Sequence, residues 1–147
     1  YKYELVPGLQ WPVHEIHSAT ITSDFDRLRQ YFGKWSWHYA IDICRRAETY
    51  IYPACAGLVT EVKYNVIFGW TVTIEHYDSM TKYCHLEGPR VQPGDMVDTS
   101  QVIARMGNTG RWSKGQHLHF EYYKYVDGGY VVADPVARKK HPGEYWK

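Results

Sequence analysis

The sequence has little cysteine, no surplus of charge of one sign and no long apolar run. Its three cysteines, Cys44, Cys55 and Cys84, are odd in number and form no CxxC pair, so they leave the redox compartment open. We expect free thiols, with a Cys44–Cys55 bridge as the alternative. The 17 Lys and Arg nearly balance the 16 Asp and Glu, so no basic surface argues for nucleic acid. No apolar stretch approaches the length of a membrane span, and no targeting segment is visible.

Aromatic residues are the one compositional excess, with 14 Tyr and 6 Trp among 147 residues. They suit β-strands as well as sugar- or peptide-binding grooves. The length predicts a single domain over residues 1–147, with about ten residues at either end peripheral to it. Because the chain starts at Tyr1 rather than Met, we interpret it as a mature or trimmed piece.

Side-chain alternation predicts an all-β fold: an antiparallel sheet in a sandwich or open barrel, with little helix. In "WTVTIEH" (70–76) the pattern places Trp70, Val72 and Ile74 inward and Thr71, Thr73 and Glu75 outward. Five further segments are rich in β-branched and aromatic residues: 38–43, 50–55, 57–64, 101–106 and 117–123. Only "SDFDRLRQYF" (23–32) predicts a short helix, with Ser23 as its N-cap.

A histidine pair stands in "GQHLHFE" (115–121). On a strand, His117, His119, Glu121 and Tyr123 point one way, while the alternate apolar side chains point to the core. A polar, ligand-capable face on such a strand indicates a site rather than a solvated surface.

A second pair of candidate ligands lies in "HYAIDI" (38–43), where His38 and Asp42 are four residues apart. A single strand would place both on one face, with the small Ala40 between them, and would bury Tyr39, Ile41 and Ile43 on the other. His38, Asp42 and one histidine of the "HLH" pair would make three protein ligands. Zinc sites with three protein ligands and an open fourth position are catalytic ones.

The remaining histidines carry weaker signals. His85, in "TKYCHLE" (81–87), would alone be read as a surface or capping residue. The HExxH signature is absent, and "HEIH" (14–17) has the wrong spacing. Four histidines are therefore interpreted as structural or surface residues: His14, His17, His76 and His141.

The order of these motifs resembles the lysostaphin-type, or LytM-like, zinc metallopeptidases, which are peptidoglycan endopeptidases. "HYAID" is similar to the family's H-x-G-I-D, "YCHL" to its Y-x-H-L, and "GNTGRWSKGQHLHFE" to its G-x-T-G-x-S-T-G-x-H-L-H-F-E. The similarity runs from about residue 11 to residue 135. It implies an antiparallel β-fold with a central groove and the metal on its floor.

The resemblance also implies the site residues. It makes His38, Asp42 and His119 the ligands of one Zn²⁺ per chain, and His85 and His117 the catalytic pair. Trp37, Tyr83, Arg111 and Trp112 become the candidates for substrate binding, with ordinary packing as the alternative for each tryptophan. The implied substrate is bacterial peptidoglycan, and we expect a monomer in the cell envelope, either periplasmic or secreted.

Several positions depart from the family pattern without removing a ligand. Ala40, Ser100 and Ala104 replace glycines, Asp26 interrupts an expected S-x-F-G, and the loop before "HLHF" is one residue longer.

Two alternatives to an active peptidase remain. One is a catalytically silent relative that binds or activates another cell-wall hydrolase. The other is a carrier or phosphotransfer domain, suggested by "VQPGDMVDTSQVIARM" (91–106), but the chain lacks the modifiable Lys that a carrier needs at the expected hairpin tip.

Overall fold

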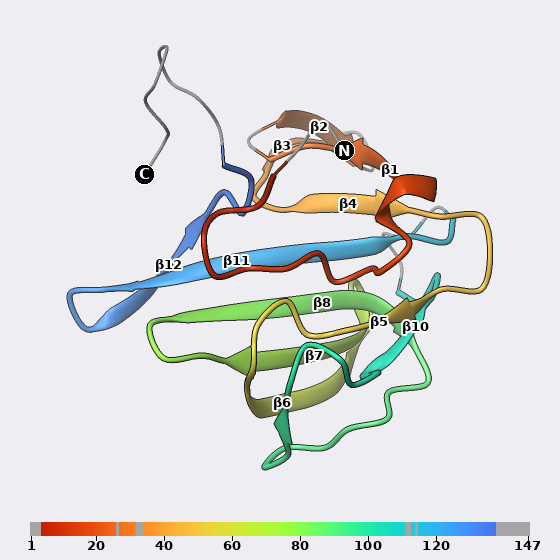
Figure 1. Ribbon diagram of the computed structural model, residues 1–147. Helices are drawn as coiled ribbons and strands as arrows, with labels where there is room; N and C mark the ends of the chain where they lie inside the picture. The colour runs from red at the N-terminus through yellow and green to blue at the C-terminus, as the bar shows by residue number, and fades with distance from the viewer. Residues whose placement is uncertain (1–3, 26, 32–33, 111–112, 114, 138–147) are drawn as a thin grey trace.

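The computed structural model describes residues 4–25, 27–31, 34–110, 113 and 115–137 (Figure 1). This part of the chain is almost entirely antiparallel β-structure, with one 3₁₀ turn, η1 (Ile16–Ser18). None of its helical segments is long and apolar enough to cross a membrane. The strands are β1 (Thr20–Ser23), β2 (Arg27–Tyr31), β3 (Lys34–His38), β4 (Ile41–Cys44), β5 (Tyr50–Ile51), β6 (Gly57–Asn65), β7 (Gly69–Glu75), β8 (Ser79–Glu87), β9 (Met96–Val97), β10 (Ala104–Met106), β11 (Leu118–Val126) and β12 (Gly129–Ala133).

Ten strands form one sheet in the order β1-β4-β11-β8-β7-β6-β9, with β12 paired to β11 and β10 bridging β8 and β5. The sheet is not closed into a barrel, and β2 and β3 form a separate hairpin. Figure 1 shows the long strands β8 and β11 side by side at the centre of the sheet. The predicted all-β, antiparallel class is therefore confirmed, in its open form.

The helix predicted for residues 23–32 is wrong. Ser23 ends β1, and Arg27–Tyr31 is strand β2. The reason is non-local, because β2 pairs with β3 over five residues, from Arg27 opposite His38 to Tyr31 opposite Lys34. Tertiary pairing of this kind overrides the weak helix propensity of a short segment.

Strand β7 matches the segment predicted at 70–76, but its faces differ from the prediction. Val72 and Ile74 are buried as expected, whereas Trp70 is 36% exposed and Thr71 and Thr73 are buried. Side chains of both alternating sets are buried in the middle of β7, so both faces of the strand are covered there. Simple alternation between inside and outside therefore fails for this strand.

The segment predicted as one strand at 38–43 is interrupted. β3 ends at His38 and β4 begins at Ile41, so Tyr39 and Ala40 connect the hairpin to the main sheet. Ile41 and Ile43 are buried as predicted, but Tyr39 is about half exposed. The segments predicted at 50–55 and 101–106 likewise contain only the short strands β5 and β10.

The hydrophobic core lies against one face of β8 and β11, where Tyr83 packs on Phe120 with ring centroids 5.4 Å apart. The first residues of the chain help to close this core, since Leu5 pairs with Val136 and the amide of Val6 donates to the carbonyl of Pro135. The three cysteines are free, as expected.

Candidate metal centre

Strands β3, β4 and β11 bring three predicted ligands together. His119 on β11 stands directly opposite Asp42 on β4, so the two side chains share a face of the sheet. His38, the last residue of β3, enters the same space from the hairpin. All three side chains are almost fully buried.

The ligand-type atoms of these residues form a small triangle. His38 Nε2 lies 3.4 Å from His119 Nδ1 and 3.3 Å from Asp42 Oδ1, and His119 Nδ1 lies 3.1 Å from that oxygen. Zinc bonds of about 2.0–2.2 Å place ligand atoms about 3.3–3.6 Å apart at the corners of a tetrahedron. Two imidazole nitrogens and a carboxylate oxygen at this spacing fit a zinc ion.

Hydrogen bonds at the far side of each imidazole fix which nitrogen faces the triangle. His38 Nδ1 lies 3.0 Å from the carbonyl oxygen of Asp24, which can only accept, so Nδ1 carries the proton. His119 Nε2 lies 2.8 Å from Glu121 Oε2 and donates to that carboxylate. The inner nitrogens, His38 Nε2 and His119 Nδ1, then offer lone pairs to a metal.

The protonation states of Asp42 and His119 depend on each other. Burial raises the pKa of Asp42, but the hydrogen bonds from His119 and His38 outweigh it and hold the pKa well below its usual range. Burial lowers the pKa of His119, but hydrogen bonds to Asp42 and Glu121 raise it to about 9. Without a metal, protonated His119 donates a hydrogen bond from Nδ1 to Asp42. A metal ion has to displace that proton.

His85 reaches the centre through a β-bulge. Cys84 and His85 on β8 stand opposite Thr71 alone on β7, and His85 has a left-handed backbone with φ of 62°. Regular alternation would turn His85 to the same side as Tyr83, whereas the bulge directs it to the other face. There its ring lies 4.7 Å from that of His117 and 5.9 Å from that of His119, measured between centroids. Such strain in a non-glycine residue is typical of functional sites.

His85 and His117 are held in the same tautomer. His85 Nδ1 lies 2.7 Å from the carbonyl oxygen of Thr109, and His117 Nδ1 lies 2.9 Å from that of Gly115. Each Nδ1 therefore carries a proton, and each Nε2 holds a lone pair when the ring is neutral. Burial lowers the pKa of His85 to about 4, although its bond to the Thr109 carbonyl raises it, so the ring is neutral near pH 7.

The four candidates for substrate binding are placed differently. Trp37 is 52% exposed beside the predicted ligand His38. Tyr83 is fully buried, and its hydroxyl accepts from the amide of Ala54, so it has no exposed surface for a substrate. Arg111 and Trp112 lie outside the described residues.

Sequence reasoning gave no role to several neighbours of the centre. Alternation along 117–123 already placed Glu121 on the face of His119, and this was the signal for its contact with the ring. Phe68 had no such signal. Its ring lies 5.5 Å from that of His119 and 6.2 Å from that of His85, between centroids.

Cys84, His119 and Glu121 also have ligand-type atoms close together. This second set shares His119 with the first, so the two cannot be complete at once. Burial raises the pKa of the Cys84 thiol, which keeps it protonated, and the thiolate is the ligand form. The triangle of His38, Asp42 and His119 is the better metal site.

Comparison with known proteins gives a consistent set of relatives. The model of peptidase family M23 matches residues 36–133. The peptidoglycan DD-endopeptidase ShyC of Vibrio cholerae is 35% identical over 105 residues, covering 69% of this chain and 24% of that protein. The structure of a zinc containing peptidase from Vibrio cholerae is 30% identical with a TM-score of 0.71, covering 87% of this chain and 39% of that one.

A third relative comes from a protein complex. SpoIIQ, in its crystal structure with SpoIIIAH, has a TM-score of 0.76 and 26% identity, covering 86% of this chain and 96% of that one. Among the curated relatives, this chain spans 24% of the length of ShyC and 38% of that of the stage II sporulation protein Q of Bacillus subtilis.

Proposed function

This chain belongs to peptidase family M23, and on that premise we propose that it is a zinc-dependent endopeptidase that hydrolyses peptide bonds in bacterial peptidoglycan. The observation that carries the proposal is the buried triangle of His38, Asp42 and His119, with two further histidines beside it. A degenerate binding module has no use for five such groups at one point.

The ligand triangle would hold zinc through His38 Nε2, Asp42 Oδ1 and His119 Nδ1. A zinc ion there would lower the pKa of a bound water molecule to about 7 and would polarise the scissile carbonyl. The bonds from His38 to Asp24 and from His119 to Glu121 orient the two imidazoles for this task.

The two other histidines supply proton transfer. We assign His117 the removal of a proton from the attacking water, because its Nδ1–H is bound to Gly115 and its Nε2 is left as an acceptor. The sequence-based role for His85 is hydrogen-bond donation to the oxyanion. Since His85 Nδ1–H is already bound to Thr109, that role requires a second proton on Nε2. The tautomer of neutral His85 thus supports proton acceptance at Nε2 more directly than donation.

Substrate contacts are proposed on the exposed aromatics next to His38. Trp37 and Tyr39 are both about half exposed on either side of that ligand, and their rings would pack against an extended peptide in the expected groove. The partner is cell-wall peptidoglycan, which requires an extracytoplasmic location. We propose that the domain acts as a monomer.

The alternative is a catalytically silent module that binds another envelope protein. It is favoured by the structural similarity to SpoIIQ, which was crystallised in complex with SpoIIIAH. The same fold therefore also occurs in a protein that forms a complex with a partner protein.

Digestion of purified peptidoglycan separates the two functions. Zinc-loaded wild type should release soluble, dye-labelled fragments from walls of at least one cross-link chemistry, and mass spectrometry of the muropeptides should identify the cleaved bond. Chelation should stop release and added zinc should restore it, with His119→Ala as the inactive reference. If wild type and His119→Ala are equally inert on every wall type, the binding module becomes the better function.

A further inference from the structure

A buried carboxylate lies behind the metal ligand His119. Glu121 Oε2 is 2.8 Å from His119 Nε2, and the Glu121 side chain is only 15% exposed. Its second oxygen, Oε1, accepts a hydrogen bond of 2.5 Å from the hydroxyl of Tyr123. Both carboxylate oxygens are thus committed, one to the ligand and one to a neighbour on the same strand.

The strand geometry creates this row. His119, Glu121 and Tyr123 alternate along β11 and therefore share its metal-facing side. Lys82 on β8 is the direct cross-strand partner of Glu121, and its ammonium lies 5.5 Å from the centre of the Tyr123 ring. Lys82 therefore lies beside the Glu121–Tyr123 pair on the same face of the sheet.

His119 has two competing places for the single proton of its neutral ring. Its Nδ1 lies 3.1 Å from Asp42 Oδ1, so a proton on Nδ1 would bond to Asp42 and block the atom that faces the metal. A proton on Nε2 bonds to Glu121 instead and leaves the Nδ1 lone pair open. The contact with Glu121 is the shorter of the two, which favours the tautomer that leaves Nδ1 free for a metal.

We propose that Glu121 is a positioning residue for the metal centre, which holds His119 in the Nε2–H tautomer, and that Tyr123 and Lys82 hold Glu121 in place. This inference deepens the proposed function, since it assumes zinc at the triangle. It assigns a task to three residues that lie outside the triangle of His38, Asp42 and His119.

Zinc affinity tests this role without any need for hydrolysis. Titration against a fluorescent zinc chelator at pH 7 should show about 10–100-fold weaker binding for Glu121→Ala than for wild type. Glu121→Gln keeps an oxygen that can accept from Nε2–H but loses the charge, so its loss should be smaller. Tyr123→Phe should lose less again. Glu61→Ala is the matched control, because Glu61 on β6 is paired only with the exposed Lys63 among the described contacts.

A spectroscopic readout separates positioning from a general structural role. In zinc-bound wild type, the ¹H–¹⁵N spectrum of the imidazoles should show a protected Nε2–H signal for His119. This signal should weaken or disappear in Glu121→Ala and stay in Glu61→Ala. Glu121→Gln, which is isosteric, keeps the test decisive if Glu121→Ala fails to fold.

Failure of the positioning role can be distinguished from failure of the proposed function. If wild type binds one zinc and both Glu121 variants bind it equally tightly with an unchanged His119 signal, the positioning role is wrong and the proposed function is untouched. If wild type takes up no zinc, the proposed function fails first and the positioning role fails with it.

Discussion

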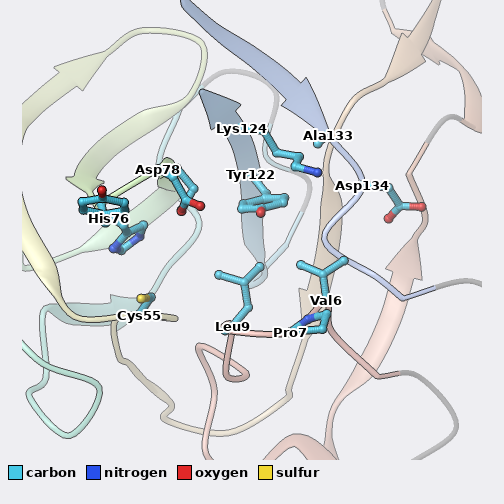
Figure 2. Close-up of a pocket in the computed structure, with 13 residues that line it drawn as sticks. Val6, Pro7, Leu9, Cys55, His76, Asp78, Tyr122, Lys124, Ala133 and Asp134 are labelled. Atoms are coloured by element: carbon cyan, nitrogen blue, oxygen red, sulfur yellow. The ribbon is translucent and has the colours of Figure 1, made fainter. Parts of the chain in front are cut away.

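Two buried polar clusters that contain histidine lie on opposite faces of the main sheet. The metal-side cluster contains His38, Asp42 and His119. The core-side cluster contains His76, Thr81 and Tyr83, and His76 lies at the wall of a pocket with Cys55 and Asp78 (Figure 2). Both clusters are nearly inaccessible to solvent, so burial does not distinguish a ligand site from a structural one.

The core-side cluster is a complete hydrogen-bond chain. The amide of Ala54 donates to the Tyr83 hydroxyl, which donates to Thr81 Oγ1 at 2.7 Å. Thr81 then donates to His76 Nε2 at 2.9 Å, and His76 Nδ1–H donates to the carbonyl of Ala56 at 2.8 Å. Every donor in this order meets an acceptor, which is the arrangement expected of a structural network.

The metal-side cluster differs because its acceptors face one another. Two imidazole lone pairs and a carboxylate oxygen converge within 3.4 Å, while the protons of both rings are bound on their outer sides. Only a proton or a cation at the common point satisfies this arrangement. The direction of the hydrogen bonds, rather than histidine content or burial, therefore separates the two clusters.

Substitutions in the two clusters should differ most in their effect on zinc content. His119→Ala should reduce zinc from near one per chain to near zero, because it removes one of three ligands, and hydrolysis should be lost with it. His76→Ala should keep a full complement of zinc. Elemental analysis of the purified proteins measures both. Full zinc retention in His119→Ala would contradict the ligand assignment.

Replacing His117 or His85, which lie beside the metal-side cluster, should have a different effect from replacing one of its three predicted ligands. His117→Ala should keep zinc and its melting temperature but slow hydrolysis by about 10²–10⁴-fold, as for loss of a general base. His85→Asn should behave similarly, and asparagine tolerates the left-handed backbone that His85 adopts. Zinc analysis and dye release on the same samples test this. Loss of zinc in His117→Ala with retention in His119→Ala would reverse the two roles.

On the core side, the expected loss is in stability alone. Tyr83→Phe removes one hydroxyl and leaves the Ala54 amide without its acceptor, which should lower the free energy of unfolding by about 1–3 kcal/mol. Zinc affinity and KM should not change. Chemical denaturation of the metal-free proteins gives the first value. A raised KM at unchanged stability would instead support the substrate-binding role that the sequence suggested for Tyr83.

The smallest effect should be a pH dependence of stability from His76. Burial lowers its pKa below 6.5, against the opposing effects of the Ala56 carbonyl and the charge of Asp78. As pH falls through 6.5, the unfolded chain gains this proton before the folded protein does, so stability decreases. Above that pH the group contributes no slope. Denaturation at pH 7.5 and 5.5 should show a steeper loss for wild type than for His76→Gln, and equal slopes would contradict this.

Much of the fold could be predicted because it depends on local patterns. The strands β6, β7 and β11 follow from β-branched and aromatic residues between turn signals, and the inward positions of Val72, Ile74 and Phe120 follow from alternation. The helix predicted at 23–32 failed because its competitor, the β2–β3 pairing, lies partly outside that window. The outward placement of Thr71 and Thr73 failed because alternation does not show that a strand will be covered on both faces.

The candidate ligands of the site could be named from the sequence, because residue identity and order along the chain specify which donor atoms exist. His38 and Asp42 were predicted as ligands from their spacing and His119 from the family resemblance, and strand alternation already put Glu121 on the face of His119. Only the tertiary structure decided how they meet. The cross-strand register placed His119 opposite Asp42, and the break after His38 brought that ring in from a separate hairpin. A bulge against Thr71 turned His85 away from the core. Register and bulges depend on pairing between distant strands, so no local pattern in the sequence encodes them.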